Sequence, residues 1–275
     1  YDESLTEFEW LYKQYTQVKE TRNDSMAKEI EKAIAYVLFQ MAEQSVKQGQ
    51  YQKGAESYLA LVKRYPLIDI ADKAVFEAGA AYEKDQQFTK AAETFMILPK
   101  QYAKSPLTIK GIVRAGDAHK KAANLKKSDK AYYEQEYREA AQTYLFITNN
   151  FPQDSMAFMA IGSAAQVYDT IADKKSAAVT YELAYKRYPK DERTPGYLYS
   201  ACLSYDEAKM TDEAIRCNKD LVRDYPKSSY ALDAAFSIPM AYANAKKWDL
   251  AASEYHNFIK AYGNDDKEKL IAAYI

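Results

Sequence analysis

Apolar positions recur along this chain in a pattern that repeats every 37 residues. Each repeat has a small residue, an aromatic residue, an apolar residue and a closing aromatic residue at positions −11, −7, −4 and 0. Spacings of four and three residues place these side chains on one face of an α-helix. The closing residues, at intervals of 37, 49, 37, 37 and 37, are Tyr65, Tyr102, Phe151, Tyr188, Tyr225 and Tyr262. Self-similarity at this pitch predicts an all-α solenoid of about six helical hairpins, which we call modules.

Each module is expected to contain an A helix, a short turn near position −16 and a B helix. Proline follows the closing residue in four modules and cannot continue a helix. Helix starts are expected at four N-cap residues, Asp69, Asp154, Thr194 and Ser228. The A helices are predicted near residues 25–48, 69–85, 105–124, 154–172, 194–209 and 228–245. The B helices are predicted near residues 51–65, 88–102, 132–150, 174–188, 211–225 and 248–262.

The modules are expected to form a single domain over residues 1–275. An N-terminal flanking helix, 1–24, is either the remnant of a preceding module or a simple cap. The modules are assigned to residues 25–65, 66–102, 103–151, 152–188, 189–225 and 226–262. Residues 263–275 are expected to begin a further helix. Because the chain starts without methionine and ends in helix-like sequence, we expect it to be a piece of a longer repeat protein.

Three modules depart from the pattern. The third contains 12 extra residues between Lys121 and Gln135, which predict a longer hairpin. Its aromatic pair, Tyr132 and Tyr133, would either form a contact site or cover the tip of its own hairpin. In the fifth module Asn218 replaces the aromatic residue at position −7. In the sixth, Pro239 stands where a small residue is expected and should kink the A helix.

Composition excludes several classes of function. The net charge is −1, with 38 basic and 39 acidic residues, which gives no basic patch for nucleic acid. No apolar run approaches the roughly 20 residues of a membrane span. The two cysteines, Cys202 and Cys217, fall in one module and are either buried thiols or a bond between its helices.

The sequence contains no recognisable catalytic, cofactor or metal site. The two histidines, His119 and His256, lie far apart in the array, and metal sites usually cluster their ligands at short spacing. No P-loop, GxGxxG, GxSxG or HExxH motif occurs. Glu134 and Glu136 are interpreted as solvated charges at a helix end. We therefore predict that the chain is not an enzyme.

The order of small, aromatic, small and aromatic-proline positions resembles the tetratricopeptide repeat family over about residues 25–262. The fifth module shows it best, with Cys202, Tyr205, Ala214, Leu221 and Tyr225-Pro226. The 37-residue pitch and the segment 225–231 resemble a bacterial cell-envelope branch, typified by outer-membrane assembly lipoproteins and a Tol–Pal-associated periplasmic protein. The resemblance implies a right-handed solenoid, a scaffolding role, and a location in the periplasm or cell envelope.

In that family the A helices line a concave wall that binds protein partners. The residues expected on this face are Phe39, Phe76, Lys110, Val113, Arg114, Tyr199 and Phe236. The aromatic rings would either seat apolar anchors of a peptide or helix, or pack between adjacent A helices. A carboxylate clamp is not expected, because Glu43 and Glu77 would repel a C-terminal carboxylate. Glu77 is instead expected to pair with Arg114.

The predicted function is a non-catalytic scaffold that binds a protein or peptide partner, without nucleic acid or a membrane span. The alternative is a structural module that self-associates through its ends or through the projection of the third module.

Overall fold

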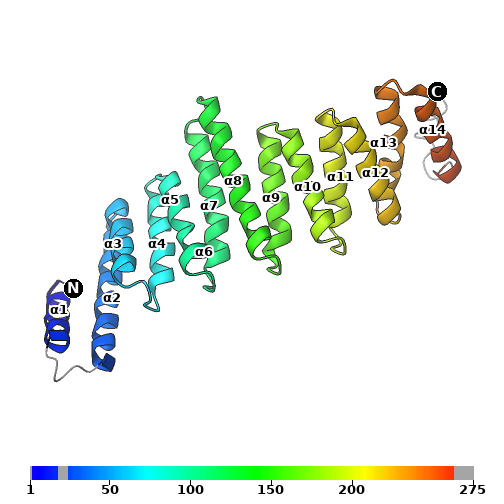
Figure 1. The fold of residues 1–275 in the computed structure, drawn as a ribbon. Coiled ribbons are helices and arrows are strands. Elements are labelled where there is room, and N and C mark those ends of the chain that lie inside the picture. Colours follow the sequence, from blue (N-terminus) through cyan, green and yellow to red (C-terminus); the bar gives the residue numbers. More distant parts are fainter. Residues whose placement is uncertain (1, 18–23, 263–275) are drawn as a thin grey trace. The chain divides into compact units, whose positions relative to one another are not determined.

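The computed structural model describes residues 2–17 and 24–262, and its regular elements there are all α-helices (Figure 1). The expected all-α helical-repeat fold is confirmed. The helices are α1 (Asp2–Gln17), α2 (Asp24–Lys47), α3 (Tyr51–Arg64), α4 (Ala71–Lys84), α5 (Phe88–Phe95), α6 (Ile97–Gln101), α7 (Thr108–Leu125), α8 (Lys130–Asn150), α9 (Met156–Thr170), α10 (Lys174–Arg187), α11 (Thr194–Glu207), α12 (Thr211–Asp224), α13 (Ala231–Asn244) and α14 (Trp248–Tyr262).

The chain divides into two compact units, residues 1–143 and residues 144–275, with the boundary inside α8. Within each unit, helices that follow one another in sequence pack together, as in α3 with α4 and α10 with α11. The further helix expected over 263–275 lies outside the described residues. None of the described helices combines the length and apolar character needed to cross a bilayer.

The helices lie within three residues of the positions that the repeat predicts, with one exception. The second B helix is divided into α5 and α6 at Met96. Pro99 lies three residues beyond this break and has no N–H to donate to the carbonyl of Phe95. Pro239 lies within α13, which continues from Ala231 to Asn244.

The turn between the A and B helices has the same geometry in five modules. The residue at position −16 has a positive φ angle between 56° and 78° in each of Gly49, Gln86, Ala172, Lys209 and Lys246. In each turn the N–H of this residue donates to the carbonyl three residues back, as Gln86 does to Glu83 (3.1 Å). The N–H of the next residue donates to the carbonyl five residues back, as Gln87 does to Tyr82 (2.9 Å). This pair of bonds is the Schellman motif, which satisfies the last carbonyls of the A helix.

The connection between modules is also repeated. The N–H at position +3 donates to the carbonyl of the closing residue, as Asp191 does to Tyr188 (3.1 Å). The N–H at position +6 donates to the carbonyl at +3, as Thr194 does to Asp191 (3.0 Å). These tight turns delay the next helix to position +5 or +6. The N-cap predictions at Asp69, Asp154, Thr194 and Ser228 were therefore wrong, because the helices begin after Ile70, Ser155, Arg193 and Tyr230.

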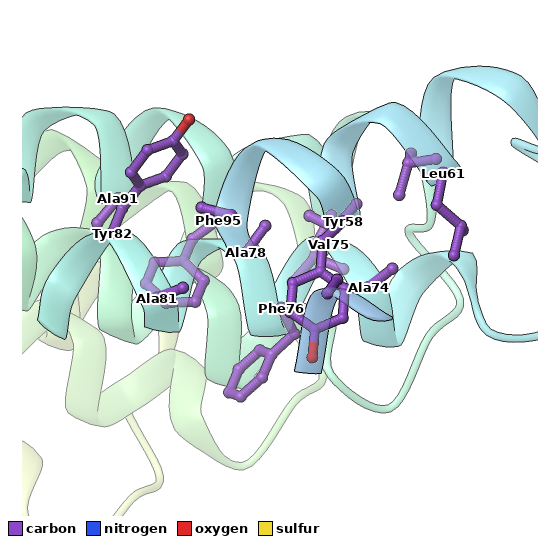
Figure 2. Packing of buried hydrophobic residues seen from close by; sticks show 14 of the residues in the cluster. Tyr58, Leu61, Ala74, Val75, Phe76, Ala78, Ala81, Tyr82, Ala91 and Phe95 are labelled. Carbon is purple, nitrogen blue, oxygen red and sulfur yellow. The ribbon is translucent and has the colours of Figure 1, made fainter. Parts of the chain in front are cut away.

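Tyrosine and alanine fill the space between the helices. In unit 1, Tyr58 and Phe95 at position −7 are buried among alanines of α4 and α5, together with Phe76 and Tyr82 (Figure 2). In unit 2, Tyr181 and Tyr205 occupy a comparable cluster with Ala177, Ala214 and the two cysteines. The cysteines form a disulfide that joins α11 to α12, so the bonded alternative is the one observed.

The third hairpin is longer than the others, as the 12-residue insertion predicts, because α7 reaches Leu125 and α8 begins at Lys130. Its aromatic pair contacts residues of its own hairpin, and the Tyr132 hydroxyl also lies 3.4 Å from Oγ1 of Thr89 in α5. The Tyr133 ring contacts Tyr137 with centroids 4.6 Å apart, and Lys126 lies 4.6 Å from the Tyr132 ring centroid. The interpretation of Glu136 as a solvated charge was wrong, because it is buried and bonded to Nδ1 of His119 at 2.7 Å.

Candidate protein-binding face

In unit 1, an aromatic ring on the A helices α2 and α4 lies close to a lysine from the next A helix. Lys73 of α4 lies 5.2 Å from the ring centroid of Phe39 in α2. Lys110 of α7 lies 5.0 Å from the ring centroid of Phe76 in α4. The two lysines are 37 residues apart, as are the two rings, so the arrangement follows the repeat. Both lysines are exposed, and a cation–ring contact at an exposed site contributes about 0.5–1 kcal/mol.

Three of the predicted residues, Phe76, Lys110 and Arg114, lie together. The Arg114 guanidinium lies 5.1 Å from the Phe76 ring centroid and 4.8 Å from that of Phe95. Arg114 also forms an ion pair with Glu83 of α4, which Lys121 joins at 3.2 Å. The expected pairing of Arg114 with Glu77 was therefore wrong. Because Glu83 and two rings already surround its guanidinium, Arg114 is poorly placed to grip a free carboxylate.

The rings themselves pack mainly on the B helix of their own module. Phe39 contacts Tyr58 edge-on with centroids 4.9 Å apart, and Phe76 contacts Phe95 at 5.5 Å. Phe76 is only 7% exposed. The most exposed predicted or neighbouring side chains of this face in unit 1 are therefore Lys73 and Lys110, while Phe39 and Val113 are half-buried.

In unit 2 the two predicted rings contact other aromatic rings. Tyr199 of α11 stacks on Tyr230, just before α13, with centroids 5.2 Å apart and planes at 26°. Phe236 of α13 contacts Phe258 of α14 at 5.2 Å. At the equivalent position of α9, Gly162 leaves room for Tyr197, whose ring would collide with an added Cβ.

Tyr58, which packs against Phe39, is buried, and this changes the pKa of its hydroxyl. Desolvation raises the Tyr58 pKa above its usual value, and the nearby carboxylates of Glu77 and Glu43 raise it further. The tyrosine therefore stays neutral. The two glutamates predicted to repel a carboxylate thus lie close enough to Tyr58 to influence its ionisation.

Sequence reasoning missed Lys73 and Tyr230. Lys73 could have been found, because it precedes Lys110 by one repeat pitch. The stacking of Tyr230 on Tyr199 depends on the path of the connection before α13, which the helical pattern does not specify. In the described part of the chain, no group of three or more His, Cys, Asp or Glu side chains is arranged to hold a metal ion.

Comparison with known proteins detects the repeat directly. A family model described as tetratricopeptide repeat matches residues 36–67 and 73–105. No curated protein matches the chain. Three solved structures illustrate the similarity. MamA 41-end from Desulfovibrio magneticus RS-1 has 15% identity and a TM-score of 0.36, covering 71% of this chain and 97% of that one.

The second is a thermophilic TPR protein in Thermus thermophilus, with 16% identity and a TM-score of 0.34, covering 76% of this chain and 99% of that one. The third is the TPR2AB-domain:pHSP90-complex of yeast Sti1, with 14% identity and a TM-score of 0.34, covering 88% and 99%. Similarity at this level identifies no function. The two segments matched by the family model begin 37 residues apart, and tetratricopeptide repeats are therefore present over α2–α6.

Proposed function

We propose that this chain is a non-catalytic scaffold that binds a partner protein, as a peptide or helix, along the A-helix faces of its units. The observation that supports this most is the repeated placement of Lys73 and Lys110 over the Phe39 and Phe76 rings. Contacts of this kind position the lysine ammonium groups on the A-helix face, where both lysines are exposed. Successive A helices thereby present regularly spaced donors to an extended acidic or carbonyl-rich segment.

Site-specific photo-cross-linking tests this proposal. A photoreactive phenylalanine analogue is placed at Lys110 in the A helix α7, and in a matched variant at Lys63, an exposed lysine of the B helix α3. We expect a discrete adduct with a partner only from Lys110, and loss of that adduct in Lys73→Glu. Equal adducts from both positions, or none from Lys110, would contradict binding on the A-helix face.

We further propose that the scaffold works in a bacterial cell envelope, with the periplasm as its compartment. The disulfide between Cys202 and Cys217 supports this, because such bonds persist in oxidising compartments and are rare in the cytosol. Acid trapping of cells followed by thiol labelling gives the test. We expect both cysteines to be protected from labelling, and free thiols on the trapped chain would contradict an oxidising location.

Self-assembly remains the alternative proposal, supported by exposed apolar side chains at the start of α14. Trp248 is 64% exposed and Leu250 is 50% exposed. Light scattering over a concentration series separates the two functions. A mass that increases with concentration and falls back in Trp248→Glu would favour self-assembly, whereas a constant monomer mass would exclude it.

A further inference from the structure

A small pocket opens between the neighbouring A helices α11 and α13 of unit 2, with α12 as its floor. Its volume is about 80 Å³, larger than the roughly 10–15 Å³ that one water requires. The floor is made by buried residues of these helices, Cys202, Ala214, Asn218 and Ala241. The rim is made by Leu203, Asp206, Ser237, Met240 and Asn244, all exposed except the half-buried Ser237.

The pocket exists because the fifth module lacks an aromatic residue at position −7. The other modules place Tyr58, Phe95, Tyr144, Tyr181 or Tyr255 there. Asn218 is much shorter than those rings, so the space between α11 and α13 is left open above it. The rest of the fifth module keeps the repeat, including the small residue Ala214 and the apolar Leu221.

Asn218, which lines this pocket, carries a buried side-chain acceptor without a partner. It is 4% exposed, and its Nδ2 donates to the carbonyl of Ala214 at 2.9 Å. That bond fixes the orientation of the side-chain amide. The Oδ1 of Asn218 is buried and has no hydrogen-bond partner. A buried acceptor without a donor costs about 1–3 kcal/mol, so an N–H group delivered from outside would be favoured there.

We propose that this pocket takes the side chain of a lysine or arginine from a partner protein. The inference deepens the proposed function, on which it rests, by naming the chemistry of one partner contact. The cationic head supplies the N–H for Asn218 Oδ1 and a charge opposite to that of Asp206. Leu203 is 45% exposed and Met240 is 43% exposed, and they give the alkyl stem an apolar surface.

Other partner side chains fit this pocket less well. An aliphatic side chain would bury Asn218 Oδ1 without a donor. A carboxylate would bring further acceptor oxygens to Asn218 Oδ1 and the Asp206 carboxylate without a donor for either. A lysine or arginine side chain offers a donor for Asn218 Oδ1, a positive charge for Asp206 and an alkyl stem for the apolar rim.

The test uses n-butylammonium as the probe and n-butanol as the uncharged control, titrated into the full chain. The readouts are the NMR signals of the Asn218 side-chain amide and the Met240 methyl group. We expect saturable shifts with n-butylammonium, at an affinity on the order of millimolar, and at least 5-fold weaker binding of n-butanol. Equal binding of the two probes, or no shift with either, would overturn the proposal.

Three variants test the assignment of each group. Asn218→Tyr restores the repeat's aromatic ring and should abolish the shift at Met240. Asp206→Asn should weaken n-butylammonium at least 5-fold without changing n-butanol. Asn218→Ala keeps the space but removes the acceptor, and it should also weaken the cation, which guards against misfolding of the tyrosine variant. Unchanged affinity in Asp206→Asn and Asn218→Ala would show that neither side chain recognises the cation and would overturn the proposal.

The result is separable from the outcome of the cross-linking experiment. Selective binding of the ammonium probe without any partner adduct would reject the scaffold function while leaving the pocket chemistry intact. A partner adduct without ammonium binding would do the reverse.

Discussion

The turn inside each module depends on one residue with a positive φ angle. Gly49 adopts φ 78° with open space around its α-carbon, whereas Ala172 must adopt φ 56° despite its Cβ. The left-handed conformation costs a non-glycine residue about 1–2 kcal/mol. The same turn is therefore relaxed in the first module and strained in the fourth.

Exchanging these residue types should change stability in opposite directions. We expect Gly49→Ala to destabilise the protein by about 1 kcal/mol, and Ala172→Gly to stabilise it by about 0.5 kcal/mol after the entropy cost of glycine. Urea unfolding monitored by circular dichroism measures both. Ala60→Gly on the exposed face of α3 is the control and should destabilise by about 1 kcal/mol. A destabilising Ala172→Gly would contradict the strain argument.

A buried carboxylate in unit 2 makes stability depend on pH. Glu182 of α10 is 2% exposed, and its carboxylate accepts from Tyr205 of α11 at 2.5 Å and from Arg216 of α12 at 2.8 Å. Burial alone would raise the Glu182 pKa, but the bonds from Arg216 and Tyr205 outweigh it and lower the pKa. The carboxylate therefore stabilises the fold in its charged form.

Because the folded pKa lies below the unfolded value, the contribution of Glu182 is fully present above about pH 4.3. It is lost as the pH falls through the folded pKa. We expect Glu182→Gln to cost about 1–3 kcal/mol at pH 7 and to reduce the further loss between pH 5 and pH 3. Urea midpoints across this pH range provide the measurement. A parallel loss in both proteins would show that other carboxylates dominate.

At the scale of the helices, three closing tyrosines each connect their module to the one before it. The hydroxyls of Tyr102, Tyr188 and Tyr225 donate to the carbonyls of Pro66, Pro152 and Pro189 at 2.9, 3.0 and 2.8 Å. Each bond joins residues 36 apart. Tyr65 is different, because α2 already forms a helix at the equivalent residues and the Tyr65 hydroxyl is buried without a partner.

This difference supplies an internal control. We expect Tyr188→Phe and Tyr225→Phe each to destabilise the protein by about 0.5–1.5 kcal/mol, since each removes one hydrogen bond. Tyr65→Phe should be neutral or slightly stabilising, since it removes an unsatisfied hydroxyl. Thermal unfolding of the three variants under one condition makes the comparison. Equal losses in all three would mean that the hydroxyl bonds contribute nothing specific.

The helices could be predicted from the sequence because each depends on a local pattern. Aromatic-proline pairs end the B helices at Tyr65, Tyr188 and Tyr225. The 37-residue spacing of the repeat predicts where the turn between the A and B helices lies. The starts of several A helices were predicted less well, because they depend on the hydrogen bonds of the preceding connection, which the helical pattern does not specify. The partner of Arg114 depends on how far the side chain reaches along α4, where Glu83 lies nearer than Glu77. The ring positions were predictable, and their burial against Tyr58 and Phe95 was not.

At the scale of the whole molecule, we expect the stability of each helix to depend mainly on the helices next to it. Helical repeats contact mainly their neighbours, so a disturbance in one unit need not weaken a distant one. The disulfide between Cys202 and Cys217 joins two helices of unit 2 across a separation of 15 residues. Closing a loop of this length stabilises a fold by roughly 3 kcal/mol in the chain-entropy account.

Reduction of this bond should therefore act on unit 2 alone. Hydrogen exchange followed by mass spectrometry, with and without a phosphine reductant, reports on each helix separately. We expect faster exchange in α11 and α12 after reduction, because their opening no longer works against the closed loop, and unchanged exchange in α3 and α4 of unit 1. The double variant Cys202→Ala/Cys217→Ala should exchange like the reduced protein and should not respond to the reductant. Faster exchange throughout both units would show that the chain unfolds as one cooperative body, against the local coupling that a repeat of this kind implies.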